Sequence, residues 1–181
     1  MLSILSKLFH SWARGWLILA LFSAFVIFAS VTLPLLRAVP GGNLVPLDAQ
    51  FFYTPGKVFS TVASYGDAGR FWILIYLTWD VVNPILYTLI FSLLISWLFQ
   101  RSFKPWSKLQ KLNVLPVGAG FFDLLENISI VTLLTVYPAR PAVVAWISTV
   151  CTMSKTSILG ISILLVLAGL AKAAINRFKK L

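Results

Sequence analysis

The chain has 181 residues, of which 59% are hydrophobic and 11% charged, and its mean hydropathy is +0.91. Soluble domains contain about 45–50% apolar and about 25% charged residues, so this composition excludes a water-soluble globular protein. The formal charge is +10. In so apolar a chain, we expect the basic residues to orient the helices in a membrane and not to bind nucleic acid. One cysteine, Cys151, and one histidine, His10, exclude an internal disulfide and a His-based metal or catalytic cluster. We therefore expect no cofactor and no metal site.

Four apolar stretches are long enough to cross a hydrocarbon core about 30 Å thick, which takes about 20 helical residues. They cover residues 15–36, 71–99, 114–137 and 142–171. The segments between them leave no room for a separate soluble domain. The sequence therefore predicts an all-α fold in which residues 1–181 form one integral membrane domain, a transmembrane four-helix bundle.

The basic residues that flank the four stretches are distributed unequally between the two sides of the membrane. Ten lie on the side of both chain ends, and four lie on the other side together with Asp48 and Asp67. Cytoplasmic segments of membrane proteins carry the excess of Lys and Arg. We therefore expect both termini in the cytoplasm.

The segment before the first stretch predicts an additional short helix. Residues 1–12 place leucines and aromatic residues at helical spacing, which is typical of an anchoring helix at the membrane interface. The first stretch exceeds 20 residues and lacks an A-x-A cleavage site. We therefore expect a retained span and not a signal peptide.

The outer loop, residues 37–70, predicts a second short helix. It opens with the turn signal Pro40-Gly41-Gly42. Thr54-Pro55 is typical of a helix N-cap followed by proline at the first helical position, and Gly66 or Gly69 of a helix end. Apolar residues at helical spacing between them predict an amphipathic helix that caps the bundle or lies on the membrane. A plain connector is the alternative.

Four ionisable residues fall inside the predicted spans at a similar depth: Asp80, Asp123, Glu126 and Lys155. A charged side chain that faces lipid at that depth opposes insertion by at least about 2.5–3.5 kcal/mol, so we expect these side chains to point toward one another. Helical spacing gives each of the three later spans one polar face. These faces predict a site that binds a ligand or a proton, formed by Asp80, Asn83, Tyr87, Asp123, Glu126, Asn127, Thr152 and Lys155. The alternative is a hydrogen-bonded network that only fixes the helix register.

The charges of this predicted site do not balance, because three carboxyls face one ammonium. We expect Lys155 to pair with Asp123 or Asp80, and at least one carboxyl to be protonated, since a water-poor site disfavours uncompensated charge. Otherwise a bound cation, a basic group of a ligand, or an arginine that reaches down from the outer surface restores the balance. The outer-loop residues that could contribute to the site are Tyr53, Arg70 and Arg140.

Several of these residues carry a resemblance to a known group of proteins. The elements that carry it are the D-x-x-E-N motif of residues 123–127 and, before it, Asp48, Tyr53-Thr54-Pro55, Gly66, Gly69-Arg70, Asp80, Pro84 and Tyr87. With them the chain resembles small uncharacterised bacterial four-span integral membrane proteins, from the outer loop through the fourth span. The resemblance implies the four-span fold, a shared polar centre and a bacterial plasma membrane, and it implies no substrate.

Four functions remain open on the sequence. The first is non-enzymatic binding of a lipid-like or small amphiphilic ligand, or of a membrane partner, at the polar centre. The second is a proton- or cation-coupled small transporter that acts as a homodimer. The third is an accessory subunit of a larger membrane complex, and the fourth is a lipid-modifying enzyme that uses paired carboxyls. The usual metal-ligand, Ser-His and phosphate-binding motifs are missing from the sequence, so we expect a non-enzymatic protein whose partners are membrane lipids and a second copy or a larger complex.

Overall fold

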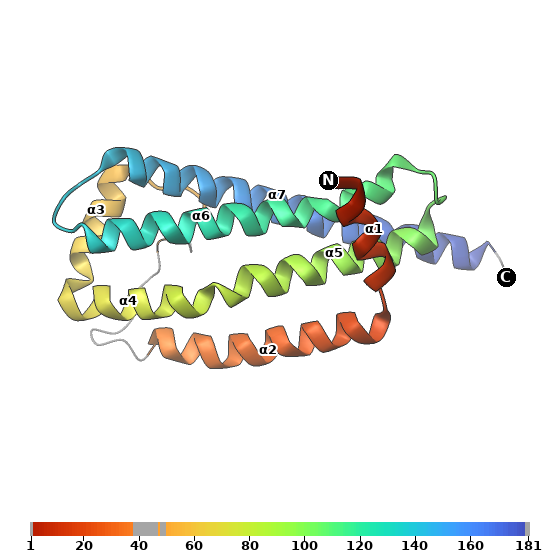
Figure 1. Ribbon diagram of the computed structural model, residues 1–181, viewed down its shortest axis with the longest axis horizontal. Coiled ribbons are helices and arrows are strands. Elements are labelled where there is room, and N and C mark those ends of the chain that lie inside the picture. The colour runs from red at the N-terminus through yellow and green to blue at the C-terminus, as the bar shows by residue number, and fades with distance from the viewer. Residues whose placement is uncertain (1, 38–46, 48–49, 180–181) are drawn as a thin grey trace.

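The computed structural model describes residues 2–37, 47 and 50–179, and every regular element within them is a helix. In chain order (Figure 1) the elements are α1 (Leu2–Trp12), α2 (Gly15–Arg37), α3 (Pro55–Ser64), α4 (Gly66–Asp80), α5 (Val82–Ser102), the 3₁₀-helix η2 (Lys108–Val114), α6 (Leu115–Thr135) and α7 (Ala142–Phe178). The predicted all-α fold is confirmed. The turn at Pro40-Gly41-Gly42 and the residue Asp48 lie outside the described residues.

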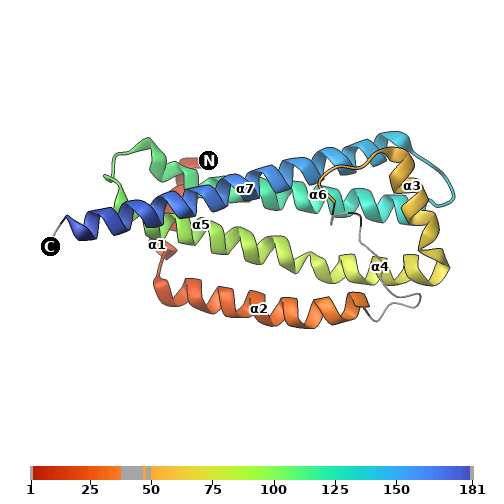
Figure 2. The same ribbon diagram turned by 180° about the vertical axis from the view of Figure 1, so that it is seen from behind.

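Four stretches of the described chain are long and apolar enough to cross a membrane: Gly15–Thr32, Gly66–Ser102, Lys108–Thr135 and Ala142–Phe178. They lie side by side along the long axis of the molecule (Figures 1 and 2). The protein is therefore a helical membrane protein with four candidate spans, as the sequence predicts. The second and fourth stretches are each 37 residues long, or about 55 Å at 1.5 Å per residue, so both exceed a hydrocarbon core of about 30 Å.

The helix α5 lies at the centre of the arrangement. It contacts α2 on one side and both α6 and α7 on the other, and α6 packs against α7. The short connection between α6 and α7 makes these two helices an antiparallel pair of neighbours, as its length predicts. The helix α2 contacts the bundle through α4 and α5, and only 6% of its apolar window is buried. Most of the surface of α2 is therefore left to face lipid.

The second span is not one continuous helix. The helix α4 ends at Asp80 and α5 begins at Val82. Pro84 explains this break, because proline lacks the N–H group that would bond to the carbonyl of Asp80 four residues earlier, and its ring crowds that carbonyl. The predicted span over residues 71–99 is present, but it is divided at its buried acid.

The short helix that the sequence predicts in the outer loop is α3. The Oγ1 of Thr54 accepts a hydrogen bond from the backbone N–H of Lys57 at 3.4 Å and caps the first turn. Gly66, with φ of +62°, forms the turn into α4, a backbone conformation that favours glycine. Val58 and Val62 are buried in an apolar cluster with residues of α6 and α7. The helix therefore caps one end of the bundle and is not a plain connector.

The predicted helix at the start of the chain is α1, which packs across the other end of the bundle (Figure 1). It contacts η2 and α5. Phe9 is buried in an apolar cluster with Leu93 of α5 and Val114 at the end of η2. The apolar face of α1 is therefore covered at least in part by protein, and it is not wholly available to lipid as the interfacial prediction supposes.

Candidate functional site

The structure brings the four ionisable residues of the spans into one buried cluster, which we call the buried centre. Asp80 lies at the end of α4, Asp123 and Glu126 lie on α6, and Lys155 lies on α7. Their exposed fractions are 3%, 2%, 0% and 8%. The two acids of α6 share a face because they are three residues apart. The convergence that helical spacing predicts is confirmed.

The ammonium group of Lys155 contacts both carboxyls of α6. Its Nζ lies 3.1 Å from the Oδ1 of Asp123 and 2.5 Å from the Oε2 of Glu126. The pair with Asp123 is one of the two predicted, whereas the pair with Glu126 was not predicted. One ammonium and two carboxylates together carry a net charge of −1 unless one carboxyl holds a proton.

Two hydroxyl groups complete the surroundings of these carboxyls. The phenol of Tyr87 on α5 donates to the Oδ2 of Asp123 at 2.9 Å, and the Oγ1 of Thr152 on α7 donates to the Oε1 of Glu126 at 2.5 Å. Each of the four carboxyl oxygens of Asp123 and Glu126 therefore has an ammonium or hydroxyl group within 3.1 Å. A polar network satisfied in this way is rigid in a low-dielectric interior.

Tyr53, from the segment before α3, extends this network. Its hydroxyl lies 2.7 Å from the Oγ of Ser148 and 2.8 Å from the Oγ1 of Thr152, and its carbonyl accepts a hydrogen bond from the Oγ1 of Thr149 at 2.9 Å. Thr152 connects Tyr53 to Glu126, so the outer-loop tyrosine belongs to the same network. The sequence names Tyr53 as a contributor but gives no sign of Thr149, which lies beside the polar stripe of α7 and not in it.

Asp80 joins the network through α6. Its Oδ2 accepts a hydrogen bond from the Nδ2 of Asn127 at 3.3 Å, and its Oδ1 accepts one from the hydroxyl of Tyr76 at 3.3 Å. Asn127 directly follows Glu126 on α6. The acid at the helix break is therefore bonded to the residue that follows Glu126, one of the two carboxyls that contact Lys155.

Three other predicted contributors lie apart from the buried centre. Asn83 is half-buried in the first turn of α5, and within the described residues no hydrogen bond joins it to the centre. Arg70 forms an ion pair with Asp67, and its guanidinium lies 3.9 Å from the ring centroid of Tyr137. Arg140 is exposed. Both arginines are thus placed at the α3 end of the molecule, where they do not contact the carboxyls of the spans.

A groove lies on the outer flank of α5 and α6. Its volume is about 370 Å³, and its lining is almost wholly apolar: Pro84, Ile85, Thr88, Leu89, Val117, Gly120, Phe121 and Leu124. Gly120 allows the two helices to approach closely, because a Cβ there would lie 2.5 Å from the Oγ1 of Thr88. The groove shares the helix α6 with the buried centre, but the four ionisable residues do not line it.

The chemistry available at the buried centre is proton binding by carboxyls that hydroxyl and ammonium groups surround. In the part of the chain that the structure describes, no group of three or more His, Cys, Asp or Glu side chains is arranged to hold a metal ion. Cys151 is buried one turn from Lys155, where it packs as a small apolar residue.

Comparison of the chain with protein-family models, with curated proteins and with solved structures gives no match. The resemblance based on the D-x-x-E-N motif therefore stays a prediction. The function has to be inferred from the geometry of the buried centre and of the surfaces around it.

Proposed function

We propose that the protein is a small proton-coupled membrane transporter, active as a homodimer, whose buried centre binds and releases the coupling proton. The observation that carries this proposal is that one ammonium, on Lys155, contacts two buried carboxyls, on Asp123 and Glu126. Uncompensated charge is costly in an apolar interior, so this group favours the state in which one carboxyl holds a proton. Release of that proton requires a compensating charge, which is the basis of coupling to a cation or solute.

The break between α4 and α5 supports the proposal. Transporters typically bind their coupling ions near the middle of the membrane at discontinuous helices. Here the break falls at Asp80, which is hydrogen-bonded to Asn127 beside Glu126. A change in the angle between the two half-helices would therefore alter the surroundings of the buried carboxyls.

The hydroxyl groups between Tyr53 and Glu126 supply a route for the proton. Hydroxyls both donate and accept hydrogen bonds, and Thr152 lies within hydrogen-bond distance of both residues. Tyr53 lies at the α3 end of the bundle. The network thus reaches from this end of the molecule to the carboxyls in its interior.

Infrared spectroscopy tests the proton directly, because a protonated carboxyl has its own carbonyl band. We expect the purified wild-type protein to show a band that disappears as the pH is raised, and we expect Asp123→Asn or Glu126→Gln to reduce it. The matched control is Asp67→Asn, since Asp67 is an exposed acid outside the centre. A spectrum without this band at any pH would contradict the proposal.

Coupled transport is tested in vesicles that enclose a pH-sensitive dye. Small organic cations and metal ions are added outside one at a time, and a coupled solute changes the pH of the lumen. We expect at least one such response with wild-type protein and a lower response with Glu126→Gln. Responses equal to those of protein-free vesicles throughout the panel would leave the buried centre with a purely structural role.

A second candidate function, non-enzymatic binding of a lipid-like ligand, is favoured by the groove between α5 and α6. Its volume of about 370 Å³ is within the range of about 300–1,000 Å³ of small-molecule sites. Leu124→Trp would fill the groove, whereas Ile128→Trp places the same ring one turn away on an exposed position outside it. Native mass spectrometry should show a retained lipid that only Leu124→Trp removes. Equal lipid retention in both variants would count against this function.

We also propose that both termini face the cytoplasm of a bacterial plasma membrane. The described basic residues at the α1 end of the molecule outnumber those at the α3 end, and cytoplasmic segments carry such an excess. A fluorescent protein fused after α7 should fluoresce in a bacterial host, and alkaline phosphatase at the same position should be inactive. The reverse pattern would invert the orientation.

A further inference from the structure

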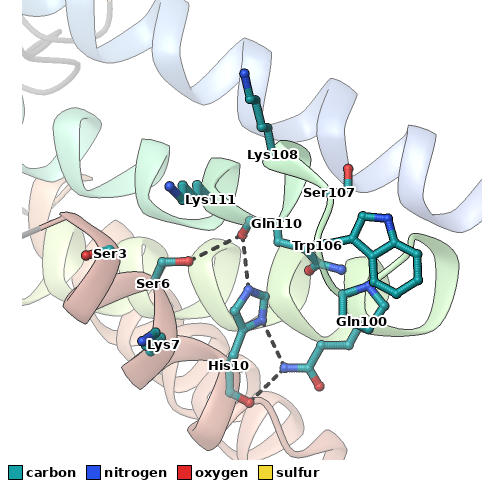
Figure 3. A pocket seen from close by; sticks show the side chains of 11 residues that line it. Ser3, Ser6, Lys7, His10, Gln100, Trp106, Ser107, Lys108, Gln110 and Lys111 are labelled. Carbon is teal, nitrogen blue, oxygen red and sulfur yellow. Dashed lines mark hydrogen bonds between the residues drawn. The ribbon is translucent and has the colours of Figure 1, made fainter.

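A second hollow lies at the α1 end of the molecule, between α1, the end of α5 and the segment that leads through η2 (Figure 3). Its volume is about 470 Å³. The lysines that line it are Lys7 of α1 and Lys108 and Lys111 of η2. All three lysines are exposed, so their ammonium groups can turn toward a ligand in the hollow.

The positive charge of this hollow is not compensated by acidic side chains. The sequence has five acidic residues, and the four that the structure describes, Asp67, Asp80, Asp123 and Glu126, do not line the hollow. Among the described residues, no ion pair involves Lys7, Lys108 or Lys111. Three neighbouring cations without a carboxylate create a positive potential that attracts an anion.

The wall between the lysines is held by hydrogen bonds around His10. The amide nitrogen of Gln100 lies 2.9 Å from the Nδ1 of His10 and donates to the carbonyl of His10 at 2.8 Å, while the Nε2 of His10 lies 3.1 Å from the carbonyl of Gln110 (Figure 3). Because an amide nitrogen only donates, Nδ1 accepts and Nε2 carries the proton. His10 is thus a neutral, fixed part of the wall, and the charge of the hollow comes from the lysines.

We propose that this hollow binds a phosphate-bearing anion, and its position favours the headgroup of an anionic phospholipid over free phosphate as the source. The hollow lies where α5 ends and before α6 begins, so it is at the end of the apolar helices, where headgroups lie. Trp106, which also lines it, is 79% exposed, and tryptophan prefers this level of a membrane. Basic pockets beside transmembrane helices bind phospholipid headgroups in this way. The inference is independent of the function proposed for the buried centre.

The test is isothermal titration calorimetry on the delipidated full-length protein in detergent. The three probes are a short-chain phosphatidylglycerol, the matching phosphatidylcholine and inorganic phosphate. The variant Lys108→Gln/Lys111→Gln removes two of the three cations of the hollow. The control Lys172→Gln/Lys179→Gln removes the same charge from exposed positions of α7 and its C-cap, which do not line the hollow.

We expect phosphatidylglycerol to bind more tightly than phosphatidylcholine. The hollow variant should bind it about 30-fold more weakly, since two lysines near a membrane surface contribute about 1 kcal/mol each, and the control variant should bind it as the wild type does. A third outcome is that inorganic phosphate binds, that Lys108→Gln/Lys111→Gln weakens this binding, and that the two lipids bind equally. The hollow would then be an anion site for free phosphate. Equal affinity of both lipids without phosphate binding, an equal loss in both variants, or no binding of either anionic probe would overturn the proposal.

Discussion

Asn113 donates a hydrogen bond from its side chain to the backbone carbonyl of Ser6 at 3.1 Å, across 107 residues of sequence. The same amide group donates to the Oγ of Ser96 on α5 at 2.8 Å. Asn113 is fully buried, so these bonds form away from water. They fix α1 to the second span and to the segment that precedes the third.

The first prediction follows from this contact. Asn113→Ala removes the side-chain amide that donates to the backbone carbonyl of Ser6. This leaves a buried carbonyl without that bond, which costs about 1–3 kcal/mol. We expect the amides of α1 to exchange hydrogen faster while the spans remain protected. The control is Asn176→Ala, because Asn176 donates to the carbonyl of Ser102 and does not touch α1. Unchanged exchange in α1 would show that its apolar contacts hold it without Asn113.

The second prediction concerns the ammonium in the buried centre. Lys155→Met leaves the carboxyls of Asp123 and Glu126 without the cation they contact, and removal of one partner of a buried ion pair costs about 3–5 kcal/mol. We expect unfolding at a lower denaturant concentration in detergent. Lys172→Met, at an exposed position on the same helix, should unfold as the wild type does.

A rescue variant distinguishes charge from packing in this result. Combining Lys155→Met with Asp123→Asn and Glu126→Gln removes all three charges, so it should recover part of the lost stability. If the combined variant is even less stable than Lys155→Met, the hydrogen bonds of the carboxyls matter more than their charge.

The third prediction compares two glycines of α7. A Cβ at Gly169 would lie 3.0 Å from the Cβ of Leu98 and 3.2 Å from the ring of Phe99, whereas a Cβ at Gly160 would meet no atom within 4 Å. The side chains of Leu98 and Phe99 would have to move by a few tenths of an ångström, so we expect Gly169→Ala to cost about 1–3 kcal/mol. Gly160→Ala should be neutral or stabilise the helix by about 0.5–1 kcal/mol. The free energy of unfolding of both variants decides the comparison, and similar values would argue against close contact of α5 with α7.

The fourth prediction is a pH dependence that comes from His10, the single histidine of the chain. Burial lowers the pKa of its imidazole below the usual 6.5, and the bond to the Gln110 carbonyl opposes part of this shift. The docked helix therefore binds the proton less readily than the released helix does. The contribution of neutral His10 to the docking of α1 is therefore complete above about pH 6.5. It is lost as the pH falls from there through the lowered pKa of the docked state.

Acid also adds charge to the hollow, because a protonated His10 faces Lys7, Lys108 and Lys111 around the same space. We expect the protection of the α1 amides, measured as exchange relative to the intrinsic rate at each pH, to fall between pH 7 and pH 5, and His10→Gln to remove most of this change. An equal loss of protection in the wild type and in His10→Gln would assign the effect to another group.

The fifth prediction tests the contribution of Tyr53. Tyr53→Phe keeps the ring but removes the hydroxyl that bonds to Ser148 and Thr152, which should destabilise the protein by about 1–2 kcal/mol. Tyr137→Phe is the control, because Tyr137 is exposed and the ring that Arg70 contacts is retained. Equal thermal unfolding of both variants would contradict the role of Tyr53.

The composition of the buried centre could be predicted from the sequence, because membrane depth and helical spacing restrict where a charged side chain can point. Asp123, Glu126 and Lys155 meet for this reason. The break at Asp80 is explained by Pro84 once the structure shows where α4 ends and α5 begins. The choice of Glu126 as the closest partner of Lys155 could not be predicted, since it depends on the rotation of α6 against α7 within a few ångströms.

The environment of α1 could not be predicted for a different physical reason. An apolar stripe on a short helix is the same whether lipid or protein covers it. The residue that decides the matter, Asn113, lies in a polar connection without helical periodicity. Only the folded chain shows that this asparagine is buried and that it reaches the backbone of α1.

The helix α2 contacts both α4 and α5, the two halves of the divided second span, and most of its own surface is uncovered. Bending of the second span at Val81 would therefore shift α2 without breaking an extensive interface. The divided span thus stands between a sparsely covered helix, α2, and the tightly paired helices α6 and α7 that carry the ion pairs of Lys155.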